Sequence, residues 1–251
     1  TKKYGAHFGH EGKLRMGELR VGDTVNARVE GPRRQATALN HSATHLLHAA
    51  LRNVLGEHVT QKGSLVNDHY LRFDFSHFEA MKPEEIRQVE DLVNAQVRRN
   101  LPIQTKIMAL DDAKELGAMA LFGEKYDDSV RVLSMGDFST ELCGGTHVSN
   151  SNEIGLIVLL NESSIGSNLR RVEMLSGFEA YEFLTNAYRS YKSVSNMLKV
   201  SEDQVSEKLN SQLELLEEYK SKLDRYKKLE LNNIVNSASS NTQDVAGFKT
   251  Y

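Results

Sequence analysis

The sequence predicts an α+β protein with three parts: a small N-terminal β-barrel subdomain, a two-layer α/β domain and a C-terminal helical, coiled-coil-like extension. Two observations support this division. In the first two thirds of the chain, segments of strand-like alternation and segments of helical periodicity both occur, without strict alternation between the two kinds. Residues 178–236 contain no glycine or proline and are rich in Glu, Lys, Leu and Tyr. The predicted boundaries are 1–37, 38–177 and 178–236, followed by a flexible linker or tail at 237–251.

Composition limits the class of protein. Of 251 residues, 39% are hydrophobic and 26% charged, and the net charge of −3 does not by itself indicate nucleic-acid binding. No apolar run approaches the ~20 residues that cross a bilayer, and no secretory signal is visible. A single cysteine fits a reducing compartment, so we expect a cytoplasmic protein without membrane contact. Because the chain starts at Thr1 without methionine, we expect it to be a piece of a longer protein.

The N-terminal segment predicts short strands and turns. Glycines recur every few residues, and residues 21–29 alternate as a strand does. Gly31 and Pro32 are expected to close this strand. The predicted architecture of residues 1–37 is therefore a small barrel.

The middle segment predicts a mixture of helices and strands. Pro83 suits the first turn of one helix, and Gly56 suits the end of another. The apolar run Ile154–Leu160 is expected to be a central strand followed by a loop at 161–167, and residues 117–128 are expected to be a loop with exposed aromatics, Phe122 and Tyr126. Helices are predicted at Thr37–Leu55, Pro83–Asn100 and Asp111–Leu116, and strands at Leu71–Ser76, Ile103–Leu110, Val130–Leu133, Ile154–Leu160 and Leu169–Leu175.

Two short motifs a hundred residues apart predict a metal site. His41 and His45 stand at i and i+4, so on a helix they project from one face with Cβ atoms about 5–6 Å apart. Cys143 and His147 are also four apart, but the two glycines between them indicate a tight turn. Three imidazoles and one thiolate suit zinc, which takes nitrogen and sulfur ligands at roughly 2.0–2.3 Å. We therefore predict that these four residues bind Zn²⁺.

Other interpretations of these motifs remain open at this point. The four residues could be a buried thiol and hydrogen-bonded histidines without a metal. A metalloprotease of the HExxH type is disfavoured, because Ser42 stands where the glutamate base would be. His48 is interpreted as a packing residue or as support behind a ligand. The role of zinc is also open, since four protein ligands close a tetrahedral shell whereas a hydrolytic zinc keeps a position for water.

The motifs carry a family resemblance. H-S-A-T-H-L-L from His41, Q-K-G-S from Gln61, R-F-D-F from Arg72 and C-G-G-T-H from Cys143 follow one another in order. Together they resemble the editing domain of bacterial alanyl-tRNA synthetases, over about residues 1–177 and on into the helical region. Threonyl-tRNA synthetases and free-standing alanyl-editing proteins share the HxxxH and CxxxH arrangement.

The resemblance implies hydrolysis of the ester in Ser-tRNA(Ala) and Gly-tRNA(Ala), with the tRNA 3′ end as partner and zinc as cofactor. Aminoacylation is not expected, because no ATP-binding class II motif is visible. The alternatives are a free-standing trans-editing deacylase and a catalytically inert, zinc-stabilised tRNA-binding module.

The resemblance also implies site residues beyond the metal ligands: Thr44, Gln61, Ser64 and Arg170 match positions of the family's editing pocket. Arg170 suits a phosphate or ribose, because a guanidinium offers five donors in a fixed fork. Thr44 could equally bond to a carbonyl one turn earlier, and Gln61 and Ser64 could belong to an ordinary loop. Arginine pairs are common on surfaces, but as further tRNA contacts we name Arg171, Arg33 and Arg34.

The C-terminal part predicts two helices, at about 178–199 and 202–235, with Ser201 as the N-cap of the second. Apolar residues in the second helix follow steps of three and four, which is a heptad-like pattern. Such a stripe packs within one chain or mediates self-association. Its members are Val205, Leu209, Leu216, Tyr219, Leu223 and Tyr226.

Overall fold

The computed structural model describes residues 2–5, 7–119, 127–240 and 243–250. The chain divides into two compact units, Thr1–Ser176 and Gly177–Tyr251. Within the described ranges, no helix combines the length and the apolar composition that crossing a membrane requires.

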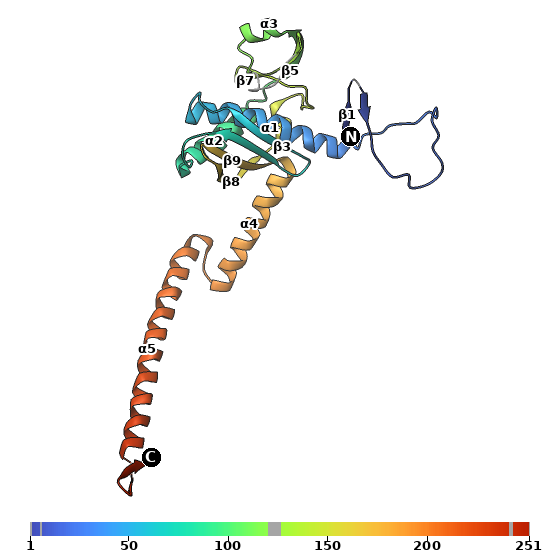
Figure 1. The fold of residues 1–251 in the computed structure, drawn as a ribbon. Helices are drawn as coiled ribbons and strands as arrows, with labels where there is room; N and C mark the ends of the chain where they lie inside the picture. The colour runs from blue at the N-terminus through green and yellow to red at the C-terminus, as the bar shows by residue number, and fades with distance from the viewer. Residues whose placement is uncertain (1, 6, 120–126, 241–242, 251) are drawn as a thin grey trace. The chain divides into compact units, whose positions relative to one another are not determined.

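The first unit is built around a four-stranded antiparallel sheet in the order β3-β4-β9-β8 (Figure 1). Its strands are β3 (Gln61–Val66), β4 (Leu71–Ser76), β8 (Ile157–Gly166) and β9 (Leu169–Ser176). Successive side chains of a strand point to opposite faces, so Leu71, Phe73 and Phe75 of β4 share one face. All three are fully buried, which confirms the predicted strand.

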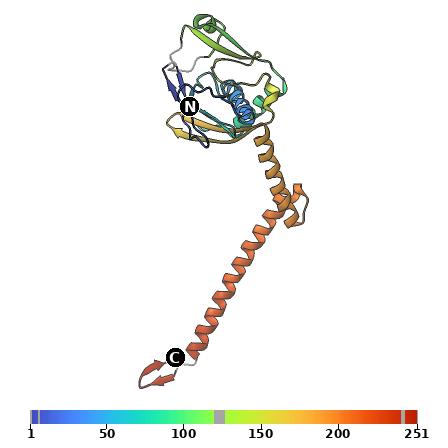
Figure 2. The ribbon, with the colours of Figure 1, turned by 90° about the vertical axis from the view of Figure 1, so that its right-hand side faces the viewer.

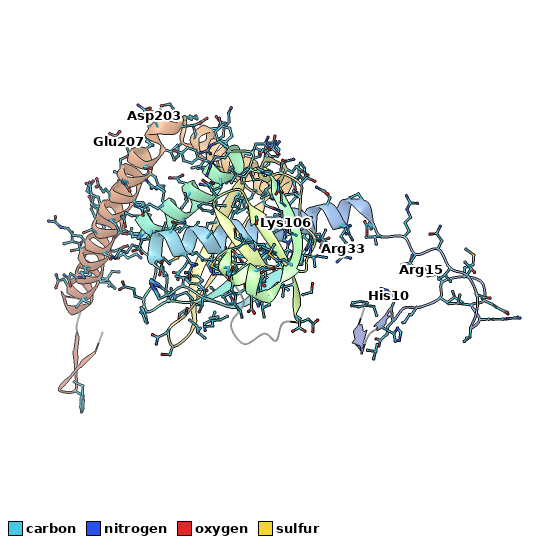
Figure 3. All side chains as sticks on the ribbon, turned by 90° about the horizontal axis from the view of Figure 1, so that it is seen from above. His10, Arg15, Arg33, Lys106, Asp203 and Glu207 are labelled. Atoms are coloured by element: carbon cyan, nitrogen blue, oxygen red, sulfur yellow. The ribbon has the colours of Figure 1, made fainter. Side chains whose placement is uncertain are left out.

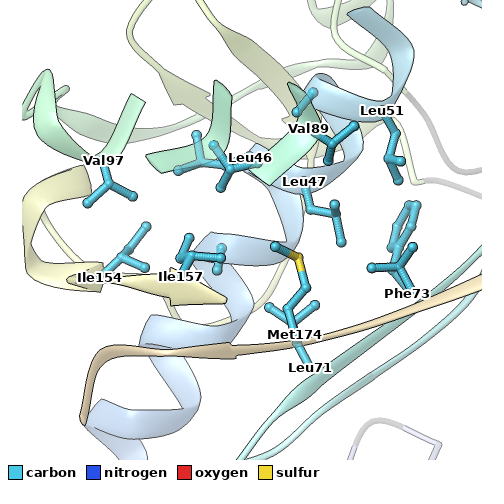
Figure 4. Packing of buried hydrophobic residues seen from close by; sticks show 14 of the residues in the cluster. Leu46, Leu47, Leu51, Leu71, Phe73, Val89, Val97, Ile154, Ile157 and Met174 are labelled. Carbon is cyan, nitrogen blue, oxygen red and sulfur yellow. The ribbon is translucent and has the colours of Figure 1, made fainter. Parts of the chain in front are cut away.

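Two helices, α1 (Gly31–Leu55) and α2 (Pro83–Arg98), bury this face of the sheet. Leu47 and Leu51 of α1 lie over Phe73 of β4 and Met174 of β9, as Figure 4 shows. Each such side chain, when fully buried, stabilises the fold by about 1.5–3 kcal/mol. Because this apolar face holds α1 in place, the histidines on another face of the same helix have fixed positions.

A second, three-stranded antiparallel sheet contains β5 (Ile103–Ala109), β6 (Ser129–Met135) and β7 (Ser139–Leu142), and a short helix α3 (Leu110–Glu115) packs on it. Figures 1 and 2 show α1 between the two sheets. Leu133 and Met135 of β6 belong to the same core as α1. The α+β class is thus confirmed.

The first helix begins earlier than predicted. It starts at Gly31 rather than at Thr37, so Gly31 and Pro32 open a helix instead of closing a strand. Proline suits the first turn, where its missing N–H has no intrahelical partner in any case.

Two predictions about β8 are wrong. Residues Ser151–Ile154 form a 3₁₀ helix (η1), so the strand begins at Ile157, and it runs on through the predicted loop to Gly166. It is also an edge strand rather than a central one. Helix α2 covers the start of its free edge: the Asn94 side chain donates to Ile157 O and accepts from Ile157 N, and Glu90 accepts from Leu159 N. An apolar strand can therefore lie at an edge when helix side chains cover that edge.

The structure does not show the predicted N-terminal barrel. In the described part of residues 1–37, β1 (Lys2–Tyr4) and β2 (His7–Gly9) form a two-stranded ribbon, and 10–30 contain neither helix nor strand. The predicted strand at 21–29 has no partner for its backbone hydrogen bonds, and its valines are exposed. The aromatic residues predicted in an exposed loop, Phe122 and Tyr126, lie outside the described residues.

The second unit consists mainly of two helices, α4 (Gly177–Leu198) and α5 (Val205–Ser240), with a 3₁₀ turn η2 (Glu202–Gln204) between them. The break falls where the sequence predicts it, because Lys199 adopts a left-handed φ of 55° and Ser195 Oγ donates to Val200 O. Helix α5 extends past the predicted end at residue 235. In the segment predicted as a linker, β10 (Gln243–Val245) pairs with β11 (Phe248–Thr250).

Candidate metal centre

The four residues predicted as metal ligands meet at one point. His41 and His45 come from the middle of α1, and Cys143 and His147 come from the turn that follows β7. One ligand atom from each lies within 4.8 Å of all the others. Cys143 Sγ is 3.5 Å from His41 Nε2 and 3.2 Å from His147 Nε2. Sulfur and nitrogen ligands of a tetrahedral zinc are about 3.5 Å apart, given bond lengths near 2.3 and 2.0 Å.

The Cys143 turn is built for close approach to α1. A Cβ atom at Gly145 would lie 1.9 Å from Cε1 of His41, whereas a Cβ atom at Gly144 would meet nothing within 4 Å. Arg131 of β6 holds the turn from behind by donating from Nη1 to the carbonyls of Cys143 (2.9 Å) and Gly145 (2.7 Å). Only glycine at position 145 lets the backbone pass this close to an imidazole.

Contacts behind the cluster fix two of the imidazole rings. His45 Nδ1 lies 2.8 Å from Oε2 of Glu141, a carboxylate that is only 3% exposed. His147 Nδ1 lies 3.2 Å from Ser42 Oγ, which also accepts from Val148 N. With Nδ1 engaged in this way, each ring presents Nε2 to the cluster.

The fit of a metal ion is tested by the one atom of the cluster that is buried without a partner. His45 Nε2 is buried and has no hydrogen-bond partner among the described atoms. A buried nitrogen left in this state costs about 1–3 kcal/mol, and coordination to a cation satisfies it. The donor set of three imidazoles and a thiolate is one that zinc accepts. The residues present therefore fit a divalent ion bound through nitrogen and sulfur.

The electrostatics of the cluster favour a thiolate. Burial opposes ionisation of Cys143, but hydrogen bonds with His147 and His41 and the nearby charge of His45 lower the pKa of the thiol to about 3. Burial also acts against a charged His45, yet the neighbouring Glu141 raises the pKa of this imidazole to about 10. The same proximity holds the pKa of Glu141 below its usual value, although burial alone would raise it. A positive charge is thus favoured at the point where the four ligand atoms meet.

The residues assigned to the pocket by resemblance make separate contacts. Thr44 is 5% exposed and donates to Asn40 O at 2.8 Å, which is the bond to the preceding turn considered as an alternative above. Gln61 Nε2 donates to Ser64 Oγ at 3.3 Å, both on β3. Across the described ranges, neither Gln61 nor Ser64 has a hydrogen bond to any of the four metal-ligand candidates.

The two arginines of β9 are engaged by carboxylates. Arg170 donates from Nε and Nη2 to Glu162, and these contacts raise the pKa of the guanidinium. Arg171 donates from Nε and Nη2 to Asp74, at 2.7 and 2.9 Å. Each guanidinium group is therefore paired with a carboxylate of a neighbouring strand in the same sheet.

The arginines at the start of α1 lie beside the metal centre. A hollow of about 350 Å³ is lined by Arg33, Arg34 and Thr37 of α1 and by Thr146 of the Cys143 turn, with residues 29–30 at its rim. Arg33, labelled in Figure 3, also pairs with Asp68 at 3.2 Å. The hollow joins a basic helix end to the cluster of candidate ligands.

Sequence reasoning missed three residues that shape this centre: Glu141, Ser42 and Arg131. Glu141 and Ser139 are both buried on one face of β7, two and four residues before Cys143. A buried acidic residue on a strand that leads into a ligand is the signal that identifies Glu141. Ser42 was considered only as the residue that replaces a catalytic glutamate.

The comparison with protein families agrees with this geometry. Residues 130–173 match the family model described as the threonyl and alanyl tRNA synthetase second additional domain. The matched segment contains Cys143 and His147, together with Arg170 and Arg171. It supports an editing domain of the kind found in alanyl- and threonyl-tRNA synthetases, and with it an interaction with tRNA.

Proposed function

We propose that this protein is the editing region of an alanyl-tRNA synthetase of the bacterial type and hydrolyses Ser-tRNA(Ala) and Gly-tRNA(Ala). One observation carries the proposal: the fold brings two histidines of α1 to the Cys143 turn, which lies inside the segment similar to the synthetase domain. Neither half of the cluster has this meaning alone, because helix-face histidines and buried thiols are both common.

The proposal assigns Zn²⁺ to His41, His45, Cys143 and His147. Zinc, when bound, supplies a Lewis acid to the ester or a fixed positive centre for the substrate. Four side chains fill a tetrahedral shell, and this favours a role in positioning the aminoacyl group over activation of water. In this proposal the four residues hold the site, and the polar residues around them select the substrate.

Selection against alanine requires a pocket that reads the seryl hydroxyl. A synthetic site shaped for a methyl group rejects a molecule that differs by one small group by only ~1–3 kcal/mol. Thr44 Oγ1 donates its proton to Asn40 O, which leaves the oxygen as an acceptor for a seryl hydroxyl. Alanine would leave such a buried acceptor unpaired, which costs about 1–3 kcal/mol.

The tRNA backbone requires positive charge near the pocket. Arg33 and Arg34 at the hollow support contacts to the phosphates of the 3′ end, and their place beside Thr146 puts such contacts next to the cluster. Arg170 keeps Nη1 for a substrate oxygen while Glu162 fixes the rest of the guanidinium. Arg171, paired with Asp74, has the same capacity.

The decisive experiment follows ester loss from tRNA(Ala) charged with labelled serine, glycine or alanine. The zinc-loaded protein is expected to deacylate the serine ester faster than the alanine ester by roughly 10-fold or more, which corresponds to the cost of an unpaired buried group. The glycine ester is also expected to be lost faster than the alanine ester, but recognition of a hydroxyl does not account for that preference. Equal rates on serine and alanine esters would contradict selection by hydroxyl recognition. No ester loss above the spontaneous rate, with zinc bound, would favour the inert tRNA-binding module.

The helical unit supports a further partner, a second copy of this chain. Val205 of the apolar stripe is buried, but the rest of the stripe is exposed, with Leu216, Tyr219 and Leu223 each at least half exposed. Heptad spacing of such residues is typical of coiled-coil association. Sedimentation of the wild-type protein and of Leu216→Glu is expected to show a dimer only for the former. The free-standing alternative is tested by whether the gene encodes an aminoacylation domain.

A further inference from the structure

A buried carboxylate lies directly behind the candidate metal centre, and the proposed function gives it no role. Glu141 is 3% exposed, and its two oxygens face different partners. Oε2 lies 2.8 Å from His45 Nδ1, and Oε1 accepts from Ser139 Oγ at 3.0 Å. His48 Nδ1 lies 3.3 Å from Oε1. Burying an ionised carboxylate is costly unless it is well paired, so this arrangement calls for a specific function.

The first consequence concerns which nitrogen of His45 faces the cluster. A carboxylate accepts but does not donate, so His45 keeps a proton on Nδ1, and Nε2, which faces the other ligands, gives up its own proton when it coordinates a metal. His45 Nε2 is the buried atom without a partner. A carboxylate behind a histidine ligand orients the ring and increases its basicity toward a metal.

The second consequence concerns charge. A divalent ion and one thiolate leave one positive charge, and Arg131 adds another beside the turn. Among the described residues, Glu141 is the one carboxylate in contact with a member of the cluster. It therefore supplies the negative charge that offsets an otherwise uncompensated cation in a partly dry site.

We propose that Glu141 is a positioning residue of the metal centre, which orients His45 with Nε2 toward the ion and offsets the charge of the ion. Ser139 donates a hydrogen bond to the second oxygen of the carboxylate, and His48 Nδ1 lies nearby without a hydrogen bond to it. This inference rests on the proposed metal site but not on the identity of the substrate. It applies equally if the module only binds tRNA.

The test measures zinc affinity by competition with a chromophoric chelator, for the wild-type protein, Glu141→Gln and the control Glu90→Gln. Glutamine keeps the size of the side chain and an acceptor oxygen but removes the charge. Glu141→Gln is expected to bind zinc about 10–100-fold more weakly, which is the usual effect of losing a partner behind a ligand. Glu90, a half-buried carboxylate that accepts from Leu159 N, lies in the same unit, and its variant is expected to bind as the wild type does.

Cobalt(II) substitution supplies a readout that general destabilisation would not move. The visible d–d bands of the cobalt protein are expected to shift in Glu141→Gln and to stay unchanged in Glu90→Gln. Unchanged zinc affinity and unchanged bands in Glu141→Gln would overturn the inference while leaving the proposed function intact. A wild-type protein that binds no zinc would overturn both.

If Glu141→Gln shows no cooperative unfolding in its zinc-free form, Ser139→Ala replaces it in the same measurements. This variant keeps the carboxylate but removes the hydroxyl that donates to Oε1. It is expected to weaken zinc binding by about 2–5-fold, less than Glu141→Gln does, because the carboxylate keeps its charge and loses only one of the groups that orient it. Wild-type affinity in Ser139→Ala would then overturn the inference.

Discussion

Two groups of partly buried histidines lie in the first unit, and they differ in how their ring nitrogens find partners. In the metal centre, His41, His45 and His147 converge on a thiolate. At the far end of β4, His58 and His77 satisfy each other, with His58 Nε2 2.9 Å from His77 Nδ1. His58 also stacks on Phe78, with ring centroids 5.0 Å apart. The pair is complete without a ligand, whereas the cluster has a buried nitrogen with no partner.

The pKa values of His77 and His45, one histidine from each group, shift in opposite directions. The pKa of His77 is lowered by burial and by the neighbouring His58, so this ring stays neutral. The pKa of His45 is raised to about 10 against the effect of burial, because Glu141 stands behind it. Histidine proximity therefore does not identify a metal site. An unsatisfied nitrogen alone does not identify one either, because both ring nitrogens of His48 are buried without a partner; the cluster differs in bringing three imidazoles and a thiol to one point.

Removing the thiolate is expected to have the largest effect. Cys143→Ala should lower zinc affinity by more than about 100-fold, because a lost ligand costs more than the ~10–100-fold typical of a lost partner behind one. Deacylation of Ser-tRNA(Ala) should fall with it. Chelator competition and ester release measure the two effects, and His58→Ala, which removes one imidazole of the pair, should leave zinc affinity unchanged. Zinc retained without hydrolysis would instead assign Cys143 to the chemistry.

A smaller effect is expected from adding one methyl group to the turn. Gly145→Ala would place Cβ 1.9 Å from the His41 ring, so that ring must move away from the other ligands. Zinc affinity should fall by about 10-fold, comparable to the loss of one oriented contact at a metal ligand. Gly144→Ala is the matched control, since its Cβ meets nothing within 4 Å. Equal affinities of the two variants would show that the turn adapts freely.

The smallest expected effect is a pH dependence at the His58–His77 pair. Because the pKa of His77 is lowered below 6.5 in the folded state, the unfolded chain takes up a proton first as pH falls. The contribution of His77 is thus complete above pH 6.5 and is lost as pH falls through and below this value. Zinc-free wild type should lose more unfolding free energy than His77→Gln between about pH 7.5 and 5.5, measured by chemical denaturation. If the unfolding free energies of the two proteins change in parallel with pH, the lowered pKa of His77 is not the cause of the pH dependence. Zinc affinity should be the same in both proteins.

Local signals in the sequence were sufficient for much of the fold and for the cluster. Spacing alone places His41 and His45 on one helix face, and two glycines predict the turn that carries Cys143. The helix from Pro83 and the strand from Leu71 follow from capping and alternation. These predictions hold because each depends on a few neighbouring residues.

Features that depend on distant partners were not predictable in this way. An apolar run such as the one at Ile157 does not indicate whether another strand or the side chains of a helix such as α2 will cover its edge. The alternating residues 21–29 give no information on whether a partner strand is present. Glu141 has no periodic signal, since its role follows from the position of His45 almost a hundred residues earlier. The carboxylate partners of Arg170 and Arg171 likewise depend on strand register.

The contact of α2 with the edge of β8 has a consequence for the behaviour of the protein at high concentration. Asn94 presents an amide that donates to and accepts from Ile157, as a residue of a fifth strand would. The N–H and C=O of Ile157 and the N–H of Leu159 are therefore already hydrogen-bonded, and they are not available to pair with a strand of a neighbouring molecule. Asn94 and Glu90 of α2 thus reduce the tendency of this apolar edge strand to aggregate, because they occupy backbone groups that could otherwise pair between molecules.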